Sequence, residues 1–103
     1  VRWGMASWAK TLSFELGKFG ITVNNILPGF TLTNRLKSLM KNRSEINKIP
    51  IKSIEKEYKK NIPAERFALP EEIASAVCFL CSREASYING INLPIDGGYS
   101  GSL

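Results

Sequence analysis

The spacing of apolar positions divides the chain into helix-like and strand-like segments. Apolar side chains recur every three to four positions along residues 1–16 and 70–83, which predicts two helices with one buried face each. Residues 21–27 and 90–95 are short runs rich in aliphatic side chains and predict two strands. Residues 31–66 are polar with short apolar stripes, so we expect helices that form a surface lid and not part of the core.

Glycine and proline mark where the predicted strands begin and end. Gly20 precedes the first strand, and Pro28 and Gly29 follow it, so this strand should end in a sharp turn. Pro94 lies inside the second strand, which favours a position at the border of a sheet. Residues 96–98, Asp-Gly-Gly, predict a structural chain reversal after that strand.

The order of the predicted elements is helix, strand, lid helices, helix, strand. This order makes the two strands parallel and joins them by a long crossover. A parallel sheet is covered on both faces, and two strands alone do not provide enough surface for that. We therefore expect the chain to need further strands, either from a larger domain or from an assembly.

The positive charge of the chain is concentrated in residues 31–66. This segment contains ten of the 14 basic residues and four of the nine acidic residues, and the whole chain has a formal net charge of +5. Such a surface attracts phosphopantetheine, coenzyme A or an acidic carrier protein. The alternative is a solvated face that needs no ligand. Nucleic acid is not expected as a partner, because no known nucleic-acid-binding motif accompanies the charge.

Cys78 and Cys81 form a C-x-x-C motif, which also occurs in redox and zinc sites. The sequence has no other cysteine and no histidine. On a helix both cysteines share a face with Ile73, Val77 and Leu80, so we expect them in the core and expect no metal. Reduced cysteines indicate a cytoplasmic protein. No apolar run approaches the ~18 residues that span a membrane, so no membrane partner is expected.

Four stretches of the sequence have a recognisable order and spacing: residues 10–24, 25–33 with Pro28-Gly29, 70–74, and 87–99 with Asp96-Gly97-Gly98. Together they resemble the C-terminal part of the short-chain dehydrogenase/reductase family. The resemblance is closest to its 3-oxoacyl-carrier-protein reductase branch. It implies an α/β fold in which residues 1–103 form the C-terminal part of a doubly wound, Rossmann-like parallel sheet, without the nucleotide-binding N-terminal half. It also implies that residues 31–66 are a substrate-binding flap.

The resemblance implies that the parent protein is an NAD(P)-dependent oxidoreductase. Members transfer hydride between nicotinamide and a carbonyl or alcohol substrate, and a 3-oxoacyl thioester is one candidate here. A tyrosine donates the proton, a lysine four residues later lowers the tyrosine pKa, and a serine upstream polarises the carbonyl. The lysine position falls on Arg2, and the tyrosine and serine would precede Val1. A guanidinium stabilises a phenolate but does not reproduce a compact ammonium group, so the alternative is a surface role for Arg2.

The resemblance also places cofactor-binding residues directly after the first predicted strand. It assigns contacts with the nicotinamide and a nearby phosphate to Pro28 and Gly29, to the backbone of Phe30 and Thr31, and to the hydroxyl of Thr33. Ligands of open α/β sheets bind at the carboxyl ends of strands, where a glycine lets the backbone approach a flat ring. The alternative is a turn in which Thr33 only caps a helix. The cofactor is expected to be NADP or NAD, since the residues that choose between them lie in the absent half.

Arg2 leaves a second functional hypothesis open. A divergent family member could bind the cofactor or form oligomers without catalysis, and a tyrosine four positions before Arg2 would favour the enzyme. The chain by itself is expected to be inactive, as part of an enzyme or as an inactive fragment. The expected partners are a small-molecule or acyl-thioester substrate, the missing N-terminal half, and further copies of the chain in a dimer or tetramer.

Overall fold

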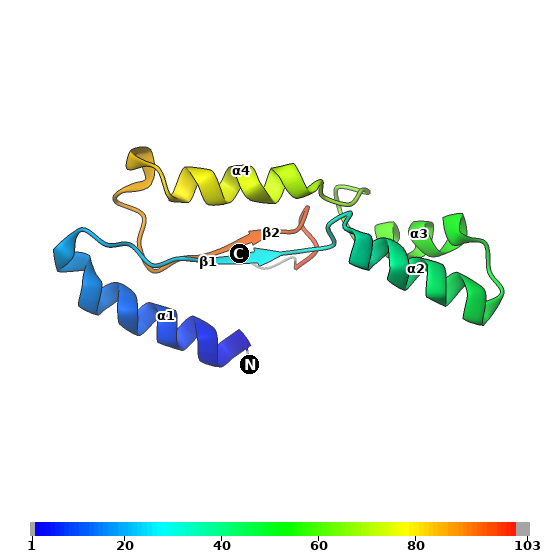
Figure 1. Cartoon of the computed structure of the whole chain (residues 1–103), viewed down its shortest axis with the longest axis horizontal. Helices are drawn as coiled ribbons and strands as arrows, with labels where there is room; N and C mark the ends of the chain where they lie inside the picture. Colours follow the sequence, from blue (N-terminus) through cyan, green and yellow to red (C-terminus); the bar gives the residue numbers. More distant parts are fainter. Residues whose placement is uncertain (1, 101–103) are drawn as a thin grey trace. The chain divides into compact units, whose positions relative to one another are not determined.

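The computed structural model describes residues 2–100, and the side chains of residues 7–100. In chain order the elements are α1 (Arg2–Leu16), η1 (Gly17–Phe19), β1 (Asn25–Pro28), α2 (Asn34–Asn47), α3 (Ile51–Lys60), α4 (Pro70–Leu80), η2 (Arg83–Ala85) and β2 (Asn92–Ile95) (Figure 1). Every predicted helix and strand is present. No helix in the described part of the chain is long and apolar enough to cross a membrane.

The two strands are hydrogen-bonded neighbours and run in the same direction. The Asn25 amide donates to the Ile91 carbonyl, and four residues later the Gly29 amide donates to the Ile95 carbonyl, both at 2.9 Å. In a parallel pair, the residue numbers of hydrogen-bonded partners increase together along the two strands, as they do here. The α/β fold with a parallel sheet is therefore confirmed.

Both strands begin later than predicted, because asparagine side chains take over most of the hydrogen bonds at their start; one backbone bond, from Gly90 N to the Val23 carbonyl at 2.9 Å, remains. Asn89 Oδ1 accepts a hydrogen bond from Val23 N at 2.9 Å. Asn24 Oδ1 accepts one from Ile91 N at 3.1 Å, and Asn24 Nδ2 donates to the Ile88 carbonyl at 3.2 Å. The residues that lead into the sheet are thus joined by side-chain amides.

The described chain divides into two compact units. The strand–helix unit comprises residues 2–27 and 74–94, and the flap unit comprises residues 28–73 and 95–100.

The strand–helix unit buries only small side chains among those described. They are Ala9 and Ser13 of α1 and Ala85 of η2. Ser13 contributes its carbonyl, which accepts a hydrogen bond from Asn89 Nδ2 at 2.9 Å. Eight large apolar side chains of this unit are exposed: Trp8, Phe14, Phe19, Ile21, Val77, Phe79, Tyr87 and Ile91.

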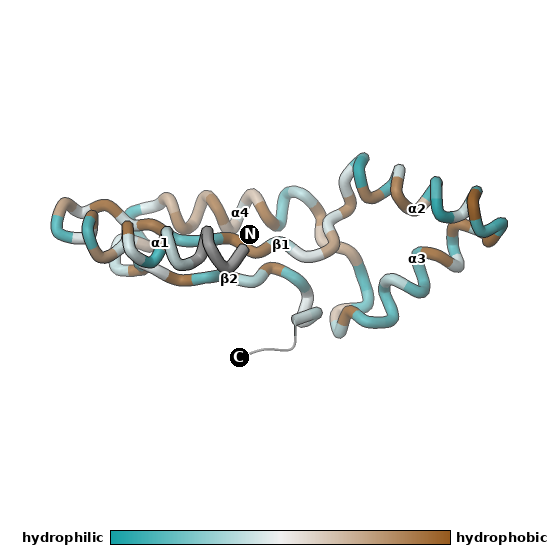
Figure 2. The backbone as a smooth tube through the Cα atoms, turned by 90° about the horizontal axis from the view of Figure 1, so that it is seen from below, coloured by the Kyte–Doolittle hydropathy of each residue, from teal (hydrophilic) through white to brown (hydrophobic). Residues whose placement is uncertain are grey.

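The prediction of a buried face on α4 is wrong for this chain. The helix contains no buried residue, Val77 is 41% exposed, and both Cys78 and Cys81 are exposed free thiols. In Figure 2 most residues of α4 have the colour of hydrophobic residues, whereas hydrophobic and hydrophilic residues alternate along α2 and α3. The physical reason is that two short strands offer too little surface to cover such a helix.

The flap unit contains the buried core of large side chains. Leu36 and Met40 of α2 meet Ile54 of α3, together with Ile62 and Phe67. Met40 and Ile54 are each 1% exposed. The expectation that residues 31–66 are not part of a core is therefore wrong. Helices α2 and α3 lie side by side (Figure 1), and their apolar stripes form this core.

Candidate cofactor site

Residues 28–33, here called the 28–33 corner, leave the carboxyl end of β1 and lead into α2. Three backbone hydrogen bonds hold this corner. Gly29 N donates to the Ile95 carbonyl at 2.9 Å, Ala68 N donates to the Phe30 carbonyl at 2.9 Å, and Leu32 N donates to the Ala68 carbonyl at 2.8 Å. The corner is thus fixed on one side by the end of β2 and on the other by the segment that precedes α4.

The amide of Thr31 is left available for a ligand. A trans peptide places N–H and C=O on opposite sides, and the Phe30 carbonyl of this peptide is turned toward Ala68 N. The Thr31 N–H therefore points away from Ala68, and among the described residues no protein group accepts its hydrogen bond. The Thr31 hydroxyl is used locally, because it donates to the Gly29 carbonyl at 3.1 Å.

Thr33 is the N-cap of α2, as predicted. Its Oγ1 accepts a hydrogen bond from Leu36 N at 3.2 Å, and its backbone is extended. A hydroxyl both accepts and donates, so the cap leaves the Thr33 proton free for another acceptor. The side chain is exposed. Capping and ligand contact are therefore compatible at this residue.

Close packing against Asp96 leaves no room for a side chain at Gly29. A Cβ atom at Gly29 would lie 2.7 Å from Asp96 Cβ and 2.8 Å from Asp96 Cα. The Asp96 carboxylate in turn accepts hydrogen bonds from Gly98 N at 2.9 Å and Ser100 N at 3.1 Å. These bonds, the one from Gly98 first, lower the pKa of Asp96. Residues 96–98 thus form the predicted turn, and the structure adds that the Asp96 carboxylate is its internal hydrogen-bond acceptor.

The ring of Phe30 belongs to an aromatic cluster in the flap unit. Its centroid lies 5.4 Å from that of Tyr58, 6.4 Å from that of Phe67 and 5.3 Å from that of Tyr99. Sequence reasoning assigned Phe30 a backbone role and did not predict this cluster, because its members are distant in sequence and share no periodic spacing.

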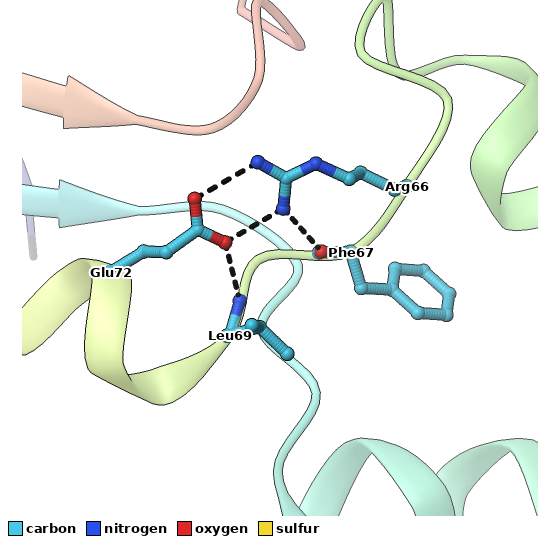
Figure 3. Close-up of polar contacts among 4 residues, drawn as sticks. All are labelled: Arg66, Phe67, Leu69 and Glu72. Atoms are coloured by element: carbon cyan, nitrogen blue, oxygen red, sulfur yellow. Dashed lines mark hydrogen bonds and ion pairs between the residues drawn. The ribbon is translucent and has the colours of Figure 1, made fainter.

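An ion pair fixes the segment between the flap helices and α4 (Figure 3). The Arg66 guanidinium donates to both carboxylate oxygens of Glu72, at 2.7 and 2.9 Å, and to the Phe67 carbonyl at 3.2 Å. Leu69 N donates to Glu72 Oε1 at 2.9 Å. The Arg66 hydrogen bonds, and then that of Leu69 N, lower the pKa of Glu72 to about 2. Sequence reasoning did not predict this ion pair.

A small cavity of about 150 Å³ lies beside the 28–33 corner. It is large enough for a few water molecules and too small for a nucleotide. Its lining combines the ion pair with apolar groups and the Asp96 turn: Phe30, Ala64, Arg66, Ala68, Glu72, Ile95, Asp96 and Gly97.

Comparison with known proteins identifies the family of this chain. Residues 1–100 match the profile of a family described as enoyl-(acyl carrier protein) reductase. A structure of a short-chain dehydrogenase family protein from Francisella tularensis superposes with a TM-score of 0.90 at 33% identity, over 96% of this chain and 41% of that one. The chain belongs to the short-chain dehydrogenase/reductase family.

Two further relatives of this short-chain dehydrogenase/reductase chain have a named activity. The 3-oxoacyl-[acyl-carrier-protein] reductase FabG of Chlamydia trachomatis is 41% identical over 95 residues, which are 92% of this chain and 34% of the relative. The L-sorbose reductase of Gluconobacter frateurii, solved with NADPH and L-sorbose, gives a TM-score of 0.89 at 35% identity, over 97% of this chain and 38% of that one. The chain spans about a third of the length of the curated relatives it matches.

The site residues predicted for this short-chain dehydrogenase/reductase chain lie in two places. The corner brings together Pro28, Gly29, Phe30, Thr31 and Thr33. Arg2 begins α1, but its side chain lies outside the described residues. Within residues 7–100 no group of acidic, histidine and cysteine side chains could hold a metal ion.

Proposed function

We propose that this chain is the C-terminal part of an NAD(P)-dependent oxidoreductase that transfers hydride between nicotinamide and a carbonyl or alcohol substrate. The observation that supports this best is the 28–33 corner, which leaves an amide donor and a hydroxyl donor free at the carboxyl end of a parallel strand. Family membership and relatives solved with NADPH or NADP point the same way.

The residues of the corner fit the nicotinamide end of such a cofactor. The Thr31 N–H is suited to donate to a carboxamide oxygen, and the Thr33 hydroxyl proton to a carboxamide or phosphate oxygen. Gly29 lets the corner pack directly against the Asp96 backbone, which fills the direction in which a side chain would extend. Bound cofactor would supply or accept the hydride, while the corner orients the ring and excludes water from one side of it.

The substrate proposal is a 3-oxoacyl thioester, bound under residues 31–66 as the substrate flap. It is supported by the activity named for the Chlamydia relative and by the positive charge of this segment, which attracts phosphate-bearing acyl carriers. Arg2 is proposed to take the place of the family's lysine next to the catalytic tyrosine. In the assembled enzyme we expect a homodimer or homotetramer, since exposed apolar side chains remain along α1 and α4.

A second candidate is a family member that binds the cofactor without catalysis. The observation in its favour is Arg2, because a guanidinium is a different donor from the ammonium group used in the family. A full-length protein that binds NADPH but reduces no 3-oxoacyl thioester would support this candidate over the enzyme.

The test compares two substitutions of Thr33 in the full-length protein. Thr33→Asp keeps an N-cap acceptor for α2 but removes the hydroxyl proton and adds negative charge, whereas Thr33→Ser keeps both functions. We expect Thr33→Asp to raise the Kd for NADPH by about tenfold or more with little change in melting temperature, and Thr33→Ser to resemble the wild type. Equal NADPH affinity in all three proteins would contradict a cofactor contact at Thr33.

A further inference from the structure

Phe30 connects the 28–33 corner to three other segments of the flap unit. Tyr58 comes from α3, Phe67 precedes α4, and Tyr99 follows the turn after β2. The Phe30 ring meets those of Phe67 and Tyr99 edge to face, with interplanar angles of 61° and 81°, and that of Tyr58 at a tilt of 47°. Edge-to-face contacts favour one ring orientation as well as burying apolar surface.

Each tyrosine of the cluster is itself held by a second contact. Arg43 of α2 donates to the Tyr58 hydroxyl at 3.3 Å, and its guanidinium lies 5.7 Å from the centre of the Tyr58 ring. Tyr99 N donates to the Asp96 carbonyl at 3.1 Å. Tyr58 is therefore anchored to the flap helices, and Tyr99 to the turn that packs against Gly29.

The position of the Phe30 backbone contributes to the direction of the Thr31 amide. Phe30 and Thr31 share one planar peptide, so rotating the Phe30 backbone turns the Thr31 N–H with it. One backbone hydrogen bond, from Ala68 N to the Phe30 carbonyl, acts directly on this peptide. The packed ring adds to the backbone hydrogen bonds of the corner by holding the Phe30 Cα, from which this peptide extends.

We propose that Tyr58 and Tyr99 are positioning residues for the cofactor, and that they act through the Phe30 ring to keep the Thr31 amide directed at the nicotinamide. This proposal rests on the proposed function of the 28–33 corner. Because Tyr58 belongs to α3, the proposal also implies that cofactor affinity depends on how α3 packs against the 28–33 corner. A corner held less firmly spends less time in its binding-competent conformation, and its apparent cofactor affinity falls in proportion.

The experiment measures NADPH binding by full-length protein carrying Tyr58→Leu or Tyr99→Leu. Leucine keeps apolar bulk but removes the ring, and we expect the Kd for NADPH to rise by about three- to tenfold, with a smaller change in kcat. Tyr58→Phe and Tyr99→Phe keep the ring and should stay within about twofold of the wild type. Tyr87→Leu is the matched control, since Tyr87 is 101% exposed and lies in the other unit.

A double variant separates positioning from general stability. If Tyr99 acts through Phe30, Phe30→Leu combined with Tyr99→Leu should raise the Kd no more than Phe30→Leu alone. The proposal is overturned if both leucine variants melt cooperatively and bind NADPH like the wild type, if the phenylalanine variants lose as much as the leucine variants, or if the two effects add fully. If one leucine variant does not fold, the other decides. Wild-type protein that does not bind NADPH would instead contradict the proposed function.

Discussion

The two units of this chain bury their apolar side chains to very different extents. In the flap unit, Met40 and Ile54 are 1% exposed and form a core with other large side chains. In the strand–helix unit, Phe14 is 80% exposed and Trp8 is 65% exposed, and only alanine and serine are buried among its described side chains. The flap helices thus form a core of large side chains, although Ile46 of α2 is itself 79% exposed. The strand–helix unit has no such core among its described side chains, and its exposed apolar side chains suit contact with further partners.

This contrast reverses the expectation drawn from polarity. Residues 31–66 are the most charged part of the chain, yet a few apolar side chains at helical spacing suffice for two short helices to bury a shared core. The clearly apolar helix α4 has no buried residue, because burial depends on what lies opposite a side chain and not only on its own hydrophobicity.

The largest effect should come from truncating the flap core. Ile54→Ala removes a side chain that is 1% exposed and should destabilise the flap unit by about 2–4 kcal/mol. Ile51→Ala in the same helix removes one that is 40% exposed and should cost less than about 1 kcal/mol. Urea unfolding of the chain, followed by amide hydrogen exchange in α2 and α3, measures both. A Phe14→Ala variant as unstable as Ile54→Ala would refute the contrast between the units.

A smaller effect is expected at the glycine of the 28–33 corner. Gly29→Ala introduces a Cβ 2.8 Å from the Asp96 backbone, so it should destabilise the corner by about 1–3 kcal/mol and weaken NADPH binding by full-length protein. Gly17→Ala is the control from the strand–helix unit, since its Cβ would meet only Asn89 Nδ2 at 3.4 Å, an ordinary contact. Chemical denaturation and cofactor titration of both variants test this. Two equally stable proteins would show that the corner tolerates a side chain.

The smallest effect on stability is expected when the pH is lowered. The pKa of Glu72 is lowered from 4.5 to about 2 by Arg66, so the folded flap unit favours the charged carboxylate. The resulting stabilisation is complete above about pH 4.5 and disappears as the pH falls toward 2. Melting temperatures between pH 2 and 6 should therefore fall more steeply for the wild type than for Glu72→Gln. Parallel curves would mean that this exposed pair does not stabilise the fold.

Much of the fold could be predicted from local signals in the sequence. Pro70 and Thr33 mark helix starts that the structure reproduces, and Pro28 with Gly29 marks the end of β1. The parallel direction of the strands followed from the length of the crossover. The corner residues are neighbours in sequence, so their proximity in the structure was assured once the turn was predicted.

Most of the contacts that escaped prediction join distant residues. Phe30, Tyr58 and Tyr99 are separated by 28 or more positions and are brought together by the packing of α3 and of the segment after β2 against Phe30. Asn89 Oδ1 accepts a hydrogen bond from Val23 N across a separation of 66 positions. Amino-acid spacing encodes helix faces and strand ends, but contacts of this kind depend on the tertiary arrangement, which a single sequence does not specify locally.

The central claim is that the 28–33 corner receives the nicotinamide of a cofactor whose remaining contacts come from residues outside this chain. Calorimetric titration of NADPH into the full-length protein and, separately, into residues 1–103 tests it most directly. We predict saturable binding to the full-length protein, weakened by Thr33→Asp, and no measurable binding to residues 1–103. Binding of equal strength by both, or no binding by the full-length protein, would contradict the claim.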